Sequence, residues 1–288
     1  MTHELKYTLT VALIILLLAA AYGLRVAVKG RVHFDRIDRL GGSRLLSKGA
    51  MELGYWILHP VARLLVSLGI TPNKLSWASL GFGFLAGAYL AMGHFGFGAI
   101  FATVSGLLDS LDGMVARISA VASDAGEVLD AAVDRYVEFF FLSGLIIYYR
   151  EIPVLQVLAL VALLGSFMVS YSTAKAEALK INPPKGSMRR PERAVYLTLG
   201  AALSTLTISW LETQREFATP IGYPMVLALG LVAIAANVSS IARLRSTAKD
   251  IRVRERDLAK ARARAAEKAL VTEQEGSQMS HHAPDVQL

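Results

Sequence analysis

The sequence predicts an all-α integral membrane protein, and three observations lead to this prediction. Hydrophobic residues make up 54% of the 288 residues and gather in several runs long enough to cross a bilayer as helices. The chain has no cysteine, so no disulfide contributes to its stability in any compartment. The net charge of +7 comes from basic residues clustered outside the apolar runs, where membrane phospholipid explains them better than nucleic acid does.

The first apolar run covers residues 7–27 and is long enough to span a membrane. A cleaved signal peptide is the competing interpretation. However, a single lysine precedes the run, no clear small-x-small cleavage site follows it, and Arg25 and Lys29 form a stop-transfer flank. We therefore expect residues 1–29 to be a membrane anchor.

Residues 30–70 turn basic and then amphipathic. Several arginines precede a stretch of mixed apolar and polar residues, which is typical of a helix that lies in the membrane interface. Thr71 and Pro72 then open the next span, with threonine as the N-cap and proline at the first helical position.

Six core spans are expected after this point, so that the anchor makes a seventh. They lie at roughly 72–92, 95–116, 127–149, 153–178, 191–212 and 220–243. Most basic residues fall on one side of the resulting arrangement, and the positive-inside rule makes that side cytoplasmic. We therefore predict a protein of the inner, cytoplasmic membrane.

Two segments follow the last span. Residues 245–271 have a strongly helical, cationic pattern that would lie along anionic lipid or solvent. Residues 272–288 are polar and typical of a disordered tail. The part before them, residues 71–244, is the expected six-span catalytic domain.

Four carboxylates stand out inside this apolar sequence. Asp109 and Asp112 are three residues apart, and Asp130 and Asp134 are four apart, so each pair projects from one face of a helix. Carboxylates inside a membrane are costly and usually functional. Two facing pairs would form a cage of oxygens in which repulsion opposes ionisation unless cations bind, and oxygen-only ligands favour Mg²⁺ or Mn²⁺.

Small residues and an arginine lie between the two acidic pairs. Gly113, Ala116 and Gly126 lack bulk where two helices and a ligand must come close, and Arg117 can fork onto phosphate oxygens. Metal-binding carboxylates, a phosphate-binding arginine and one carboxylate left to take a proton are the parts that phosphoryl transfer needs.

These positions together resemble the signature of the CDP-alcohol phosphatidyltransferase family. The pattern D-x2-D-G-x2-A-R-x8-G-x3-D-x3-D is filled at every position from Asp109 to Asp134, and the resemblance extends from about Thr71 to Arg243. It implies the six-span fold of that family and a homodimer. It also implies transfer of a phosphatidyl group from CDP-diacylglycerol to an alcohol, with release of CMP, at a site open to the cytoplasm.

The resemblance also implies roles for individual residues. The metal ligands would be Asp109, Asp112, Asp130 and Asp134, the last of which would also act as the general base. The CDP-activated lipid would contact Asn73, Ser76, Gly113, Arg117 and Ser123. A pocket for the acceptor's phosphate, similar to that of phosphatidylinositol-phosphate synthases, would contain Lys175, Arg193 and Arg243. This pocket favours inositol phosphate as the acceptor, followed by glycerol phosphate, and then serine or another uncharged alcohol.

Other charged residues near the motif receive a structural interpretation. Four lie outside the pattern: Asp124, Glu127, Arg135 and Glu138. The basic residues ahead of the fifth core span, Arg190 among them, are mostly explained by the positive-inside rule.

Two other protein classes compete with the transferase. Intramembrane prenyltransferases hold Mg²⁺ and a diphosphate on Asp-rich helices, but they need two separated Asp-rich motifs, and this chain has one such region. An ion-coupled transporter would use the acidic cluster to bind a cation and would require no nucleotide.

Overall fold

The computed structural model describes residues 3–30, 48–181, 188–212 and 220–280. Nearly all of these residues are helical and none is in a strand, which confirms the all-α prediction. The basic stretch at 31–47 and the end of the predicted tail at 281–288 lie outside the described residues.

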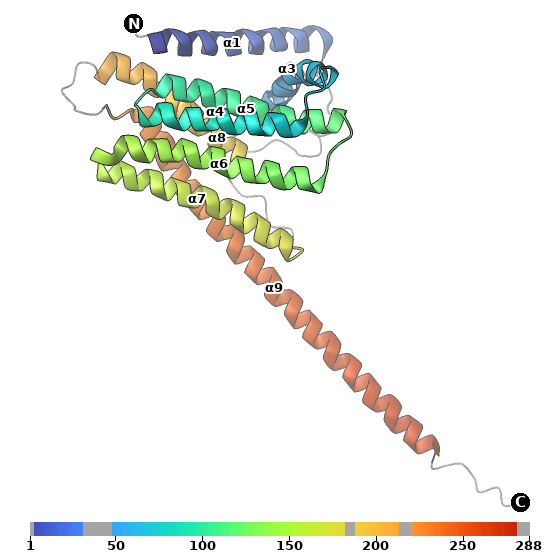
Figure 1. The fold of residues 1–288 in the computed structure, drawn as a ribbon. Coiled ribbons are helices and arrows are strands. Elements are labelled where there is room, and N and C mark those ends of the chain that lie inside the picture. Colours follow the sequence, from blue (N-terminus) through green and yellow to red (C-terminus); the bar gives the residue numbers. More distant parts are fainter. Residues whose placement is uncertain (1–2, 31–47, 182–187, 213–219, 281–288) are drawn as a thin grey trace, which may run out of the picture. The chain divides into compact units, whose positions relative to one another are not determined.

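From α3 to α7 the helices follow one another with short connections (Figure 1). They are α1 (His3–Lys29), α3 (Lys48–Ser67), α4 (Pro72–Ala91), α5 (Phe95–Ile118), α6 (Asp124–Tyr148), α7 (Pro153–Ala178), α8 (Arg190–Thr207) and α9 (Tyr223–Ser280), with a 3-10 turn at Tyr149–Glu151 and a π turn at Ile208–Glu212. The chain divides into two compact units, one of residues 1–171 with 186–240 and one of residues 172–185 with 241–288.

In the first unit, α4 packs along both α5 and α6 (Figure 1). On one side, Gly87 of α4 and Gly144 of α6 allow backbone contact, because a Cβ atom at either position would collide with backbone of the other helix. On the other side, the hydroxyls of Ser79 and Ser105 each donate to the other's carbonyl oxygen, at 3.0 and 2.8 Å. Helix α4 therefore fixes the distance between α5 and α6, which carry the acidic motif.

Two apolar clusters fill the first unit. The larger joins side chains of α4 to α9, with Leu90, Leu142 and Leu229 fully buried. In the smaller, Leu58 of α3 packs with Val115 of α5 and their neighbours. An amphipathic helix was predicted before residue 70, and α3 covers with its apolar face the part of α5 that bears the motif.

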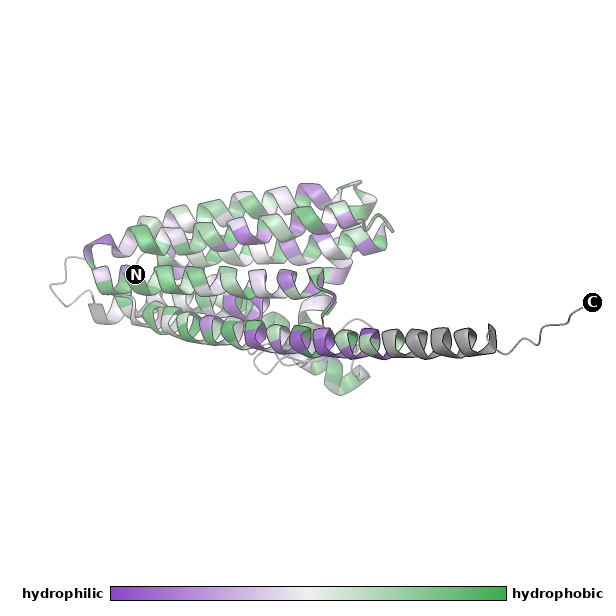
Figure 2. Cartoon of the chain, turned by 90° about the horizontal axis from the view of Figure 1, so that it is seen from below, coloured by the Kyte–Doolittle hydropathy of each residue, from purple (hydrophilic) through white to green (hydrophobic). Residues whose placement is uncertain are grey.

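Four helices in the described part of the chain are long and apolar enough to cross a membrane: α1, α5, α7 and α9. Figure 2 shows that hydrophobic residues prevail along the helices of the first unit. The other three predicted spans are helical, as α4, α6 and α8, but their composition is less apolar. The acidic motif residues of α6 and the hydroxyl and charged residues of α8 explain the lower hydropathy, so for these helices crossing the membrane stays a prediction.

Helix α9 differs from the prediction for the C-terminal part. It runs from Tyr223 to Ser280 without a break, whereas the sequence analysis expected the span to end near residue 243 and a disordered tail to begin at 272. No proline interrupts the sequence between Pro224 and Pro284. Extending an existing helix needs no new nucleation, so the polar residues continue it.

Helix α1 is attached to its own unit at both ends. Near its start, the Glu4 carboxylate accepts the backbone N–H groups of Gly96 and Phe97 at 2.5 and 3.2 Å. The residue before α5 provides no side-chain cap, so Glu4 supplies from another helix the negative charge that a helix N-terminus favours. Near its end, the Tyr22 hydroxyl donates to Glu52 of α3 at 3.2 Å.

Replacing Glu4 by alanine is expected to lower the thermal unfolding midpoint of the detergent-purified protein by a few degrees, because a helix cap contributes about 1 kcal/mol. Glu151→Ala is the matched control, since its ion pair with Arg150 is exposed on both sides. An unchanged midpoint for Glu4→Ala would show that α5 does not depend on this cap.

Candidate active site

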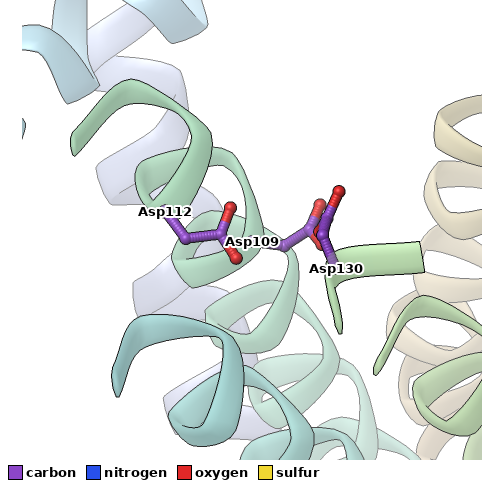
Figure 3. A group of neighbouring side chains, drawn as sticks. All are labelled: Asp109, Asp112 and Asp130. Atoms are coloured by element: carbon purple, nitrogen blue, oxygen red, sulfur yellow. The ribbon is translucent and has the colours of Figure 1, made fainter. Parts of the chain in front are cut away.

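Three of the four motif carboxylates come together between α5 and α6. Asp109 and Asp112 lie one turn apart on α5, and Asp130 of α6 faces the same space (Figure 3). One ligand oxygen from each lies within 4.8 Å of the others. Oxygens on opposite sides of Mg²⁺ or Mn²⁺ stand roughly 4 Å apart, so small side-chain movements would bring these three carboxylates onto one ion.

A serine of α4 orients one of these carboxylates. The Ser76 hydroxyl donates to Asp112 Oδ2 at 2.6 Å, and both side chains are buried. In this position Ser76 lies behind a candidate metal ligand, where such hydrogen bonds fix ligand orientation. Its expected contact with the CDP-activated lipid stays a prediction. Asn73, one turn earlier, is exposed.

The fourth motif carboxylate is paired with an arginine that the sequence analysis did not assign to the site. Arg190, the first residue of α8, donates from its two Nη atoms to both oxygens of Asp109 at 3.1 and 3.2 Å. Its Nη2 atom also forms an ion pair with Asp134. Asp134 therefore lies beside the group of three carboxylates, and its metal contact stays a prediction.

A sequence signal for Arg190 existed. In Arg-Pro-Glu-Arg, Arg190 and Arg193 are three residues apart and share one helical face. The positive-inside rule accounted for Arg190, so the sequence analysis assigned only Arg193 to the site.

Arg193 is fully buried and already paired. Its Nε and Nη2 atoms donate to the two oxygens of Glu138 at 2.7 and 3.0 Å, and its side chain is 1% exposed. Its Nη1 atom is buried and has no hydrogen-bond partner among the described residues. Glu138, for which a structural role was expected, thus forms an ion pair with Arg193, and the acceptor-binding role of Arg193 stays a prediction.

The remaining motif residues shape the ends of the two helices. Arg117 lies over Gly113, because a Cβ atom at position 113 would stand 3.1 Å from Arg117 Nη1. Arg117 also donates to the Tyr55 hydroxyl of α3 at 3.5 Å. Ser123 is the N-cap of α6, and its hydroxyl accepts the N–H of Gly126 at 3.2 Å.

The other predicted acceptor-site residues belong to the second unit. Lys175 is exposed, and Arg243 is buried, with its Nη1 atom donating to Thr173 Oγ1 at 2.5 Å. Because Arg193 lies in the first unit, the pocket that would join these three residues stays a prediction.

A small cavity adjoins the acidic motif. It has a volume of about 70 Å³ and lies between α5, α6 and α8. Asp134, Glu138 and Arg190 line its polar part, and the other walls are mostly apolar, with Val137 and Leu197 among them.

Comparison with known proteins identifies the family. Residues 69–242 match the family model described as CDP-alcohol phosphatidyltransferase. The chain belongs to this family. The resemblance drawn from the motif is thereby confirmed.

Similar relatives of this transferase include phosphatidylinositol phosphate synthases. That of Corynebacterium glutamicum is 31% identical over 159 residues, which cover 54% of this chain and 73% of the relative. That of Mycolicibacterium smegmatis is 30% identical over 190 residues, which cover 65% of this chain and 81% of the relative.

Solved structures of a Mycobacterium tuberculosis phosphatidylinositol phosphate synthase share the fold. The crystal structure with CDP-DAG bound aligns with a TM-score of 0.57 at 27% identity, over 66% of this chain and 93% of that one. A second structure of that protein, in complex with manganese and citrate, also has a TM-score of 0.57 at 27% identity and covers 66% of this chain and 88% of that one.

Ser76→Ala is expected to weaken Mn²⁺ binding by roughly tenfold, the loss typical when a hydrogen bond to a metal ligand is removed. Titration followed by the electron paramagnetic resonance signal of free Mn²⁺ measures this. Ser110→Ala on α5 is the control, because its hydroxyl is exposed and bonds within its own helix, to Gly106 O at 3.0 Å. Equal affinities for the two variants would contradict an orienting role for Ser76.

Proposed function

We propose that the enzyme transfers the phosphatidyl group of CDP-diacylglycerol to a hydroxyl of inositol phosphate and releases CMP, a step of phospholipid biosynthesis. One observation supports this above all: three carboxylates converge as an oxygen-only site, with a fourth beside them. Family membership and the relatives' common activity as phosphatidylinositol phosphate synthases support the same reaction.

In the proposed mechanism, Asp109, Asp112 and Asp130 would hold the divalent metal. The bound metal would neutralise the diphosphate and stabilise the departing CMP. Asp134 takes the proton of the acceptor hydroxyl, and it would also add a contact to the metal. The hydroxyl oxygen attacks the phosphorus next to the lipid, and the bond from that phosphorus to the CMP oxygen breaks.

The donor lipid would be held by the residues around the start of α4 and the turn between α5 and α6. Arg117 is suited to the diphosphate, because a guanidinium forks onto phosphate oxygens and Gly113 leaves room for it. Asn73, Ser76 and Ser123 would complete the contacts, although Ser76 and Ser123 already bond to Asp112 and Gly126.

A phosphorylated acceptor is favoured by the basic residues assigned to its pocket. Of these, Lys175 is exposed, whereas Arg193 has two of its nitrogens engaged by Glu138. Glycerol phosphate is the second acceptor on the same reasoning, and serine or another uncharged alcohol is the third. The prenyltransferase and transporter alternatives lose their support, because the chain belongs to the CDP-alcohol phosphatidyltransferase family.

We also propose the membrane arrangement. Helices α4 to α9 would form the six-span core over residues 71–244, α1 an additional span over 1–29, and α3 an interfacial helix at the end of 30–70. The basic segment 245–271 and the tail 272–288 would follow on the cytoplasmic side. The enzyme would be a homodimer of the inner membrane, with its site open to the cytoplasm and in contact with membrane phospholipid.

The direct test is CMP release by purified enzyme with CDP-diacylglycerol and Mg²⁺, with inositol phosphate, glycerol phosphate, serine and inositol offered separately. We expect release with inositol phosphate, because the basic pocket would recognise its phosphate. Release with another acceptor alone would correct the acceptor, and absence of release with all four would contradict the proposed reaction.

Asp134→Asn is expected to lower turnover in this assay by at least roughly a hundredfold, the usual loss for a general base, while Mn²⁺ and CDP-diacylglycerol still bind. Asp124→Asn is the control, since Asp124 lies at the exposed start of the same helix and outside the motif. Normal turnover in Asp134→Asn would contradict the role of Asp134 as general base.

Lys175→Gln is expected to raise KM for inositol phosphate roughly three- to tenfold with little change in kcat, since loss of one charge-assisted hydrogen bond weakens binding to that extent. Lys180→Gln serves as the control, because Lys180 is also exposed and was not assigned to the pocket. A KM unchanged in both variants would remove Lys175 from the acceptor site.

A further inference from the structure

We propose that Arg190 is a resident counter-ion that the divalent metal displaces when it binds. In the metal-free enzyme the guanidinium occupies Asp109 and Asp134, and metal binding drives it off Asp109 and frees Asp134. This inference rests on the metal site of the proposed function and adds to it an exchange between a protein cation and a metal cation.

Asp109 is the residue that both cations need. It belongs to the group of three carboxylates whose oxygens converge, and it is also the bidentate partner of Arg190 at 3.1 and 3.2 Å. A fork of this kind engages both carboxylate oxygens at once. A metal that binds Asp109 together with Asp112 and Asp130 must therefore approach oxygens that Arg190 already holds.

Electrostatics favours exchange over joint occupancy. Without metal, the motif brings four carboxylates close together, and Arg190 supplies a permanent positive charge to two of them. With metal bound to Asp109, the guanidinium and the ion would carry like charges on opposite sides of one carboxylate. Their repulsion in a partly buried site opposes the arrangement in which both remain.

The surroundings of Arg190 give it somewhere to go. Its side chain is 32% exposed, and it lines the 70 Å³ cavity that Glu138 also lines. Glu138 interacts electrostatically with Arg190 across this space. A guanidinium that turns away from Asp109 can therefore enter this cavity, where solvent and the negative end of the Arg193–Glu138 pair lower the cost of its charge.

The next arginine on the same helix shows the contrast. Arg193 makes a similar fork to Glu138, but its side chain is 1% exposed and contacts none of the motif carboxylates through a described ion pair. Helix α8 thus carries two ion pairs one turn apart. The Arg193–Glu138 pair is buried, whereas the Arg190–Asp109 pair is more exposed and involves a candidate metal ligand. Displacement of Arg190 would leave Asp134 available to an acceptor hydroxyl at the stage when metal is in place.

The test is Mn²⁺ binding, measured by electron paramagnetic resonance on the purified full chain without CDP-lipid or acceptor. Arg190→Gln is expected to bind Mn²⁺ roughly fivefold more tightly than the wild type, since coupling between two competing ligands typically changes affinity by at least about this factor. Arg190→Lys keeps the charge but lacks the forked guanidinium, so its Mn²⁺ affinity should lie between those of the wild type and Arg190→Gln. Arg189→Gln is the matched control, because it removes an adjacent charge that forms no ion pair with any residue the structure describes. Its affinity for Mn²⁺ should equal that of the wild type.

Thermal unfolding gives a second readout. Arg190→Gln should lower the midpoint more in chelator than in saturating Mn²⁺, because the ion pair it removes would exist only in the metal-free enzyme. Equal losses in both conditions, or Mn²⁺ binding unchanged or weakened in Arg190→Gln, would overturn the exchange and make Arg190 a permanent support of Asp109. A wild type that binds no Mn²⁺ would contradict the metal site itself, and so would be distinguished from failure of the exchange alone.

Discussion

Four carboxylates on adjoining helices inside an apolar protein impose the constraint on which this structure depends. Such groups repel one another and are costly to remove from water, so they persist only where cations and hydrogen-bond donors compensate them. Among the described residues, Arg190 supplies a positive charge to Asp109 and Asp134, and Ser76 supplies a neutral donor to Asp112. The remaining negative charge is what makes the site suited to a divalent metal.

Helix α4 sets the distance between the two helices that carry the carboxylates. Its Gly87 allows backbone contact with α6, and its Ser79 exchanges hydrogen bonds with Ser105 of α5. Because α5 and α6 carry the two acidic pairs, the packing of α4 sets how far apart those pairs stand. Helix α1 lies outside the family-matched residues 69–242, and its Glu4 also holds the start of α5.

Two glycines of the motif leave space for neighbouring side chains. Gly113 leaves space for the Arg117 guanidinium, and Gly126 leaves space for the Ser123 hydroxyl that caps α6. The positions of these two glycines are thus explained by the side chains that they accommodate within their own helix or turn. A sequence pattern of glycines and carboxylates becomes one arrangement in which helix ends, an arginine and the metal ligands fit together.

The sequence by itself determined the helical class, the family and the pairing of carboxylates by helix, because hydrophobic runs and i,i+3 or i,i+4 spacing act locally. Only the tertiary structure decided that Asp134 pairs with Arg190, 56 positions away, that Ser76 serves Asp112, and that Arg193 is engaged by Glu138. These contacts join different helices, and their choice depends on how the helices pack. Helix periodicity carries no information about that packing, so it could not distinguish Arg190 from the other basic residues beside it.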